Sequence, residues 1–450
     1  VTANMPKFTE WGTVSLIEPS TFDAGTAYVV VDAHRLDDMK PYLFKTTDYG
    51  KTWKSLSATM KQDVYLHAVR EDPKKRGMLY VGTERGVVYS RDDGATWEPL
   101  KAGLPTVAVH DLRVKDNDLV VATHGRSFWI LDNLTALREW KPEFKAADAF
   151  LFPAAPATRW RYSGNFHERG LGQNPPAAAM IEYWLKAKSE KPVTIDILDA
   201  KGAVVRTLSS VADPQEWPVD DPDAGGDENE ADLKNAPGVQ RAFWDFRYEG
   251  AREVWKAKID AGSPGDGPLA NPGAYTVRLT VDGKTYTQPL TVNPDPRLRM
   301  TAAEYDEQLK FSLAIRDDFS RLTDIIESLR SARDQIQSRR DVVEDDKAFA
   351  AWVKDADAVV AKLDALEDKL HNPKAEVVYD ILAFKGGAKL YSRLGPLYSF
   401  VVENDGVPTQ GMREVYASQK AELESLDKEW KALASGDLAV LVKNATPAIV

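Results

Sequence analysis

The sequence contains no cysteine among its 450 residues. Disulfides, thiolate metal ligands and cysteine nucleophiles are therefore excluded. It also contains no apolar run approaching the roughly 20 residues of a membrane-spanning helix, so we expect no membrane span. The first residues, VTANMPKFTEWG, have no signal-peptide pattern. A chain without cysteine is typical of the bacterial cell envelope or exterior, and we expect an extracytoplasmic protein, periplasmic or secreted.

Positive charge is also in deficit, because 58 lysines and arginines face 69 acidic residues and leave a formal net charge of -11. This balance disfavours binding to nucleic acid or to an anionic membrane. The sequence has no glycine-rich phosphate loop, no nucleophile-elbow serine motif and no His-Glu-x-x-His motif. We therefore expect no cofactor of the kinds that these motifs bind.

Residues 1–140 consist of short β-branched and aromatic runs that end at turn residues, such as TAYVVVDAH and YLFKTTD. GMLYVGTERGVVYSRDDG and NDLVVATHGRSFWILDN repeat the same format. Thr46 and Ser90 hold equivalent places, so the period is 44 residues. Such a period with about four short strands per repeat predicts β-propeller blades, about three of them.

A short element follows the third run of each of the first two repeats. It reads Ser/Thr-x-Asp-x-Gly-x-Thr-Trp. Its two copies comprise Thr46, Asp48, Gly50, Thr52 and Trp53, and Ser90, Asp92, Gly94, Thr96 and Trp97. Aspartate accepts hydrogen bonds from nearby backbone N–H groups, glycine adopts conformations that other residues resist, and tryptophan packs back onto the sheet. These roles predict a structural turn, because a catalytic aspartate would not recur in each repeat.

The remainder of the chain changes composition twice. A Gly- and Pro-rich stretch predicts a linker over residues 141–175. Alternating patterns such as PVTIDILDAKGAVVRTLS and GAYTVRLTVDGKTYTQPLTV predict an immunoglobulin- or fibronectin-like β-sandwich over residues 176–297. Three apolar stripes at helical spacing predict an antiparallel helical bundle over residues 300–450, with Arg333 interrupting the first stripe. The predicted fold class is thus multidomain β plus α.

The repeated element resembles the Asp-box of sialidase-type propellers, which occurs in sialidases, xyloglucanases, photosystem assembly factors and sortilin-type receptors. Longer segments, among them VVVDAHRLDDMKPYLFKTTDYGKTW, YVGTERGVVYSRDDGATW and GVQRAFWDFRYEG, extend the likeness over nearly the whole chain. They resemble the C-terminal part of large secreted bacterial proteins, often labelled sortilin-like or BNR-repeat glycosyl hydrolases. The resemblance implies a propeller, then a sandwich, then a helical tail, and it implies no particular reaction.

Three blades are fewer than the four or more of a usual propeller. An open arc would also leave sheet edges and apolar faces uncovered. We therefore expect residues 1–140 to complete a propeller whose remaining blades belong to upstream sequence of the same parent chain or to another polypeptide.

Two charged segments are candidate binding sites. ATHGRSFWILDN contains His124, Arg126 and Asp132, and DAHRLDDMKPY contains His34, Arg35 and Asp37, followed by Asp38. Loops at one end of a propeller often carry binding residues. The alternatives are an ordinary turn between strands for the first segment and a solvated loop for the second.

The stretch DPDAGGDENEAD offers a candidate calcium loop. Its ligands would be Asp221, Asp223, Asp227 and Asp232, with Gly226 at the sixth position. Gly225 stands where a fifth-position ligand is usual and no helices flank it, so a mobile acidic insertion is the alternative. His167, Glu168 and Arg169 lie in the predicted linker and give only weak support for a metal site.

Two functions from different classes remain open. The first is a non-catalytic binding or scaffold protein that recognises a polypeptide or a glycan. The second is part of a glycoside hydrolase whose paired carboxylates lie mainly on further blades, since no such pair is apparent in residues 1–140. Assembly of a larger membrane or surface machine is a third, by analogy with the photosystem factors.

Overall fold

The computed structural model describes most of the chain. The described residues are 2–161, 174–212, 231–255, 257–259, 261–382 and 385–445. The chain forms two compact units, one comprising Val1–Ala155 with Glu182–Lys186 and the other comprising Pro156–Ile181 with Ala187–Val450.

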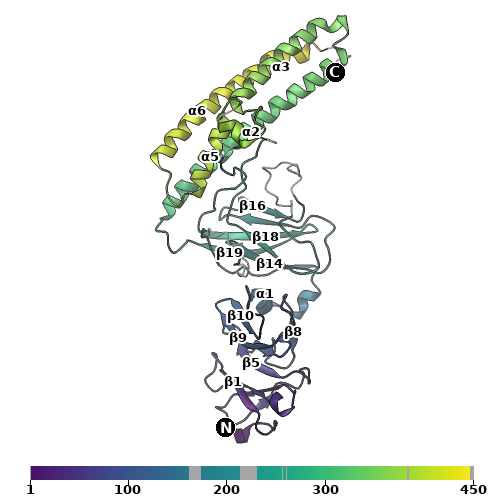
Figure 1. Ribbon diagram of the computed structural model, residues 1–450, viewed down its shortest axis with the longest axis vertical. Helices are drawn as coiled ribbons and strands as arrows, with labels where there is room; N and C mark the ends of the chain where they lie inside the picture. Colours follow the sequence, from purple (N-terminus) through teal and green to yellow (C-terminus); the bar gives the residue numbers. More distant parts are fainter. Residues whose placement is uncertain are drawn as a thin grey trace. The chain divides into compact units, whose positions relative to one another are not determined.

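Three antiparallel sheets make up most of the first unit (Figure 1). The first sheet has the order β1 (Thr13–Pro19), β2 (Ala27–Asp32), β3 (Tyr42–Thr46) and β4 (Lys54–Ser55). The second sheet has the order β5 (Leu66–Glu71), β6 (Leu79–Thr83), β7 (Gly86–Ser90) and β8 (Glu98–Leu100). The third sheet, within the described residues, contains β9 (Val109–Lys115), β10 (Asp118–Thr123) and β11 (Phe128–Leu131). Each is a simple meander, the strand order typical of a propeller blade.

The second sheet is covered on both faces. Val69, Leu79 and Val81 pack in one core cluster with Tyr28 and Val30 of the first sheet. On the opposite face, side chains of the second sheet pack in another cluster with those of the third, namely Tyr80, Val87 and Tyr89 with Val109, Leu112 and Leu119. Strand β5 accordingly contacts both β1 and β9.

The two copies of the repeated element form the turns between β3 and β4 and between β7 and β8. Asp48 accepts hydrogen bonds from the amide and the hydroxyl of Thr52 at 2.8 and 2.7 Å. Asp92 accepts the equivalent pair from Thr96 at 2.8 and 2.6 Å. Gly50 and Gly94 both have φ of +80°, a conformation that glycine adopts without strain. Every hydrogen bond of the two aspartates described here thus stays within its own turn.

The tryptophans of the two turns differ in their partners. Trp53 Nε1 donates to the Gly50 carbonyl of its own turn at 3.2 Å. Trp97 Nε1 donates to the Leu56 carbonyl, which follows β4, at 3.0 Å. The second turn is therefore fastened to the first sheet as well as to its own.

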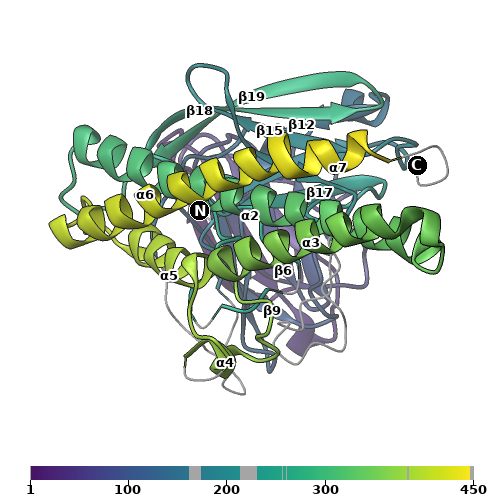
Figure 2. The same ribbon diagram turned by 90° about the horizontal axis from the view of Figure 1, so that it is seen from above.

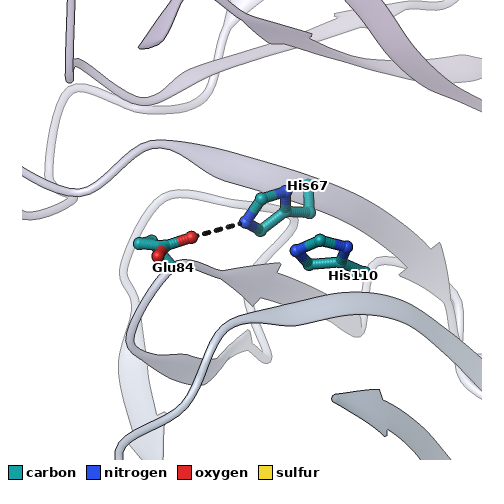
Figure 3. A group of neighbouring side chains, drawn as sticks. All are labelled: His67, Glu84 and His110. Carbon is teal, nitrogen blue, oxygen red and sulfur yellow. Dashed lines mark hydrogen bonds and ion pairs between the residues drawn. The ribbon is translucent and has the colours of Figure 1, made fainter. Parts of the chain in front are cut away.

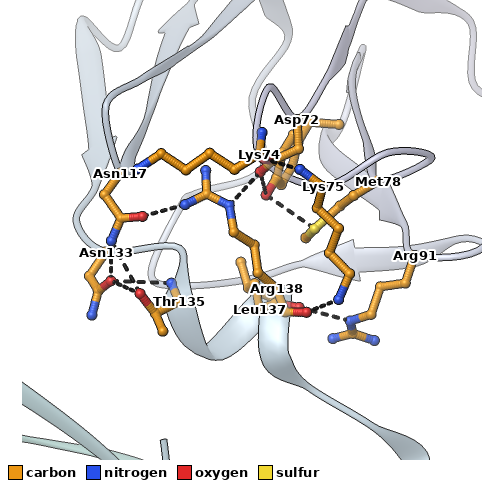
Figure 4. A network of polar contacts seen from close by, with 11 residues as sticks. Asp72, Lys74, Lys75, Met78, Arg91, Asn117, Asn133, Thr135, Leu137 and Arg138 are labelled. Atoms are coloured by element: carbon orange, nitrogen blue, oxygen red, sulfur yellow. Dashed lines mark hydrogen bonds and ion pairs between the residues drawn. The ribbon is translucent and has the colours of Figure 1, made fainter. Parts of the chain in front are cut away.

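A buried ion pair fastens α1 (Thr135–Glu139) to the second and third sheets (Figure 4). Arg138 Nε donates to Asp72 at 2.8 Å, and both side chains are almost fully buried. Asn117 accepts a further hydrogen bond from Arg138. Arg91 donates to the Leu137 carbonyl at 3.2 Å. Removing either member of the buried pair would leave an uncompensated charge, so these contacts specify where α1 lies on the two sheets.

Strand β14 (Ala179–Leu185) is divided between the two units. Its Glu182 is buried and accepts a hydrogen bond at 3.1 Å from the Ala136 amide in the first turn of α1. A carboxylate at a helix N-terminus satisfies a free N–H group. The second half of β14 also pairs with β12 (Ala149–Leu151). These contacts explain why Glu182–Lys186 belongs to the first unit.

The second unit contains a five-stranded sheet. Its order is β13 (Ala157–Thr158), β19 (Lys284–Asn293), β18 (Gly273–Val281), β15 (Thr194–Leu198) and β16 (Val204–Ser209). Strand β17 (Gly238–Trp244) belongs to a three-stranded sheet of order β12-β14-β17. Strands β18 and β19 form a hairpin whose turn residues, Asp282 and Gly283, both have positive φ, as the Asp-Gly sequence predicts.

Helices make up the rest of the second unit, and the longest lie alongside one another (Figures 1 and 2). They are α2 (Ala302–Val343), α3 (Ala350–Leu370), α4 (Val378–Leu382), α5 (Leu390–Glu403), α6 (Gln410–Leu433) and α7 (Ala439–Lys443). Thr301 and Glu304 form a capping box at the start of α2. The predicted apolar stripes of α2, α3 and α6 share one core cluster with α5. No helix in the described part of the chain is long and apolar enough to span a membrane.

An ion-pair network crosses from α2 to α3 beside this core. The Glu367 side chain is 2% exposed and binds Arg330 Nε at 2.9 Å and Arg333 Nη1 at 2.6 Å. Burial opposes ionisation, but the two arginines hold the pKa of Glu367 below its ordinary value. Arg333, which interrupts the apolar stripe, therefore has a partner on the neighbouring helix.

We predict that Glu367→Gln destabilises the helices by about 1–3 kcal/mol, because it leaves two arginines without their buried counter-charge. The matched control is Asp364→Asn, which removes an exposed partner of Arg333 and should cost less than about 1 kcal/mol. Urea unfolding followed by circular dichroism at 222 nm measures both. Equal losses in the two variants would contradict the prediction.

We predict that the turn at Asp48 stays intact well below the usual titration range of aspartate. Hydrogen bonds from the Thr52 hydroxyl and amide, and from Thr46, lower the pKa of Asp48 to about 2. A lowered folded-state pKa contributes stability above the ordinary value of 3.8, and this contribution is lost as pH falls toward about 2. The Thr52 amide resonance should therefore remain unshifted down to about pH 3. A shift of the Thr52 amide resonance with a midpoint near pH 3.8 would contradict this prediction. So would a shift that persists in Asp48→Asn.

Candidate functional site

The two ends of the three sheets carry different side chains. In a meander, the start of the first strand and the turn between the second and third strands lie at one end of the sheet. The turn between the third and fourth strands lies at the other end, where Asp48 and Asp92 are. Aromatic and titratable side chains collect at the first of these ends.

Five rings form a continuous row there, which we call the ring row: His34, Tyr65, His67, His110 and His124. Successive ring centroids are 4.5, 5.2, 4.3 and 4.7 Å apart. The row includes four of the six histidines in the sequence. All three sheets contribute, because His34 follows β2, and His67 and His110 are the second residues of β5 and β9.

Carboxylates orient two of these rings. Asp32 accepts a hydrogen bond from His34 Nδ1 at 2.7 Å. Glu84, in the turn between β6 and β7, accepts one from His67 Nε2 at 2.9 Å (Figure 3). Burial opposes ionisation of Glu84, but the hydrogen bonds from His67 and Tyr65 hold its pKa below the ordinary value. Glu84 is therefore a carboxylate at neutral pH.

Two other members of the ring row have shifted pKa values. Burial, together with the hydrogen bond to Glu84, raises the pKa of Tyr65 to about 12, so the phenol stays protonated. Burial and the neighbouring His67 and His124 lower the pKa of His110. His110 is consequently neutral at pH 7 and has a free lone pair on its ring.

The sequence-predicted site residues fall in different places. His34 and His124 lie at the two ends of the ring row. Arg35 and Asp37 lie on and just after a short 3₁₀ helix, His34–Leu36, and are exposed. Arg126 is exposed in the turn between β10 and β11, and Asp132 follows β11 and is half-buried.

The calcium candidates are only partly within the described residues. Asp232 accepts a hydrogen bond from the Ser209 amide at 3.1 Å. Asp221, Asp223 and Asp227 lie outside the described residues, as do His167, Glu168 and Arg169. The calcium loop stays a prediction.

Sequence reasoning missed Tyr65, His67, Glu84 and His110. A signal was present, since Val64-Tyr65-Leu66-His67 matches Val107-Ala108-Val109-His110 at a spacing of 43 residues, close to the repeat. Glu84 and His124 are equivalent as well, because each directly follows the threonine that ends the second strand of its sheet. Aligning the repeats over their whole length would have found these residues.

A second polar cluster lies between the first and second sheets, in a cavity of about 400 Å³. The Tyr28 hydroxyl is within 3.2 Å of Glu71 and 3.1 Å of Asp93, so it bridges two carboxylates. Glu71 is also bonded by Ser20 and by the Gly77 amide, and Asp93 pairs with Lys45. These carboxylates are consequently well satisfied by protein groups.

The second unit contains a larger polar cavity of about 870 Å³, lined by residues around β16, residues 248–253 and α2. Its arginines already have acidic partners. The pairs are Arg206–Glu249, Arg252–Asp324, Arg316–Asp317 and Arg321–Asp318. Because these cations are neutralised locally, the cavity is a weaker candidate for anion binding than its arginine content indicates.

No family model and no curated protein matches this chain. Solved structures similar to it include a GH74 enzyme of Niastella koreensis, at 11% identity and a TM-score of 0.24, covering 62% of this chain and 46% of that one. A GH74 xyloglucanase of Xanthomonas campestris has 11% identity and a TM-score of 0.22, covering 66% and 40%. YCF48 bound to a D1 peptide has 12% identity and a TM-score of 0.21, covering 62% and 66%. The chain thus spans less than half of the two GH74 chains.

Proposed function

We propose that this chain is a non-catalytic binding or scaffold protein of the bacterial cell envelope or exterior. Its three sheets act as Asp-box blades of a larger, sortilin-like propeller. The remaining blades come from the same parent chain or from another polypeptide. A polypeptide or glycan binds at the end of the blades that carries the ring row.

The observation that carries this proposal is the exposure of β1. Pairing registers make Ile17 of β1 equivalent to Val69 of β5 and Leu112 of β9. Val69 and Leu112 are 0% and 1% exposed, whereas Ile17 is 61% exposed. In the second and third sheets this apolar position is therefore covered by a neighbouring sheet, whereas in the first sheet it is exposed.

A second position behaves in the same way. Val14 is 45% exposed, while its equivalents Leu66 and Val109 are 1% and 0% exposed. Burying each such side chain contributes about 1.5–3 kcal/mol. The missing neighbour has to pack against β1 as the first sheet packs against β5 and as the second sheet packs against β9. We therefore infer that it is another blade of the same kind.

The exposed edge strand of the third sheet also indicates that a further polypeptide segment covers the three sheets. Phe128, Trp129 and Ile130 on β11 are all exposed, at the edge of a sheet that has three strands in the described residues. Exposed apolar edge strands are normally covered by a partner.

The ring row supports the choice of ligand class. Its aromatic faces suit the C–H surfaces of sugars and the side chains of peptides. Arg35, Asp37 and Arg126 are exposed in or beside the turns at the same end, and they would add charged contacts at the rim. These contacts serve binding and do not require the ligand to be chemically altered.

The alternative function is part of a glycoside hydrolase. The observation that favours it is the bridging of Glu71 and Asp93 by one hydroxyl, since such enzymes use two carboxylates roughly 5–9.5 Å apart. The many donors that already satisfy Glu71 favour the non-catalytic function instead.

We predict that a photo-crosslinker, p-benzoylphenylalanine, placed at position 17 will crosslink in the native host to a polypeptide segment carrying the Asp-x-Gly-x-Thr-Trp element. The control position is Lys362, an exposed residue on α3, which should give no such product. Mass spectrometry of the crosslinked peptides reads out the result. The absence of crosslinks from position 17, or crosslinks only to sequences without that element, would overturn the proposal.

We predict that the purified chain releases no reducing sugar from a panel of polysaccharides that includes xyloglucan. The variants Glu71→Gln and Asp93→Asn test the alternative, with Asp364→Asn, an exposed change on α3, as the control. Hydrolysis by the wild type that both carboxylate variants abolish and Asp364→Asn retains would establish the glycoside hydrolase and exclude the non-catalytic function.

A further inference from the structure

Three side chains in the middle of the ring row can each direct one ligand atom toward a common point (Figure 3). They are His67, Glu84 and His110, and their ligand atoms all lie within 4.8 Å of one another. A tetrahedral metal ion at about 2.0–2.2 Å from each atom requires mutual distances of about 3.3–3.6 Å. The widest of the present separations must therefore shorten when an ion binds.

The three residues lie on strands and in a tight turn. His67 and His110 occupy the same place at the start of neighbouring strands β5 and β9, which are in contact. Glu84 lies in the two-residue turn between β6 and β7. Sites on strands and tight turns keep their geometry better than sites on long loops.

The hydrogen bond between His67 and Glu84 accounts for the placement of those two residues but not for that of His110. The pairing of Glu84 with His67 at 2.9 Å satisfies those two residues. The His110 ring lies beside the His67 ring, tilted by 33°, yet no described residue forms a hydrogen bond with its imidazole. A ring with an unused lone pair, placed beside a carboxylate and a second imidazole, has the character of a metal ligand rather than of a packing residue.

We propose that His67, Glu84 and His110 bind a divalent transition-metal ion, Zn²⁺ in preference to Ca²⁺ or Mg²⁺, with water completing the coordination. Two imidazoles and one carboxylate are a donor set that suits Zn²⁺, whereas calcium and magnesium take oxygen ligands. Three protein ligands leave a position open to solvent or to a ligand oxygen.

The surroundings support the site in two further ways. Tyr65 donates a hydrogen bond to Glu84, and such contacts orient a metal ligand. Glu84 is 39% exposed and His110 is exposed, so an ion can reach the site from solvent. All of these residues lie in the first unit, so the site does not require additional blades or a bound polypeptide or glycan.

The test is a titration of the full chain, purified without a histidine tag, with ZnCl₂ alone. Isothermal calorimetry and metal analysis after dialysis should give one zinc per chain. His110→Ala and Glu84→Gln should each weaken binding by at least about tenfold. His34→Ala is the matched control, since His34 belongs to the ring row but is not one of the three ligands, and it should bind zinc as the wild type does.

Zinc K-edge absorption spectroscopy of the loaded chain should show two imidazole ligands. Removal of the exposed His110 creates no buried cavity, so this variant should fold normally. Failure of the wild type to bind zinc at micromolar concentration would overturn the proposal. So would zinc binding that His110→Ala and Glu84→Gln leave unchanged, since the ion would then lie elsewhere.

Discussion

Each sheet of the first unit has two apolar faces, and the need to bury both is the constraint on which the unit depends. The second sheet meets it fully, with Val69 packed toward the first sheet and Tyr80 toward the third. The first sheet meets it fully on one face and only in part on the other, where a smaller apolar cluster is buried but Ile17 stays exposed. The same contacts that cover the second sheet also bring His67 beside His110. Packing between sheets therefore creates both the open surface and the ring row.

Local patterns in the sequence predict much of the fold. The Asp-Gly pairs predict where the chain turns, as at Asp282 and Gly283, because these turns depend on backbone conformation and on bonds within a few residues. The apolar stripes predict the helices, because their period is a local property. The partner of Arg333 is not predictable in this way, since Glu367 is 34 residues away and only the packing of α2 on α3 brings them together.

The candidate site was harder to predict for the same physical reason. His34 and His124 stand out in their own segments, but nothing local indicates that Tyr65, His67 and His110 lie between them. Their proximity depends on the spacing between neighbouring sheets, which is a tertiary property. The repeat does carry a trace of it, because a histidine recurs at the same strand position 43 residues later. Only knowledge that adjacent repeats pack side by side turns this recurrence into a site.

The placement of the aspartate turns at one end of the sheets and the ring row at the other has an evolutionary consequence. The turn residues form their hydrogen bonds locally, as Asp48 does with Thr52. A duplicated repeat therefore retains all the residues that its turn needs in order to form. The opposite end is then free to diversify from copy to copy, as Glu84 and His124 do at equivalent positions. A chain built in this way can acquire new ligands by substitution at one end without altering the residues that make each copy fold.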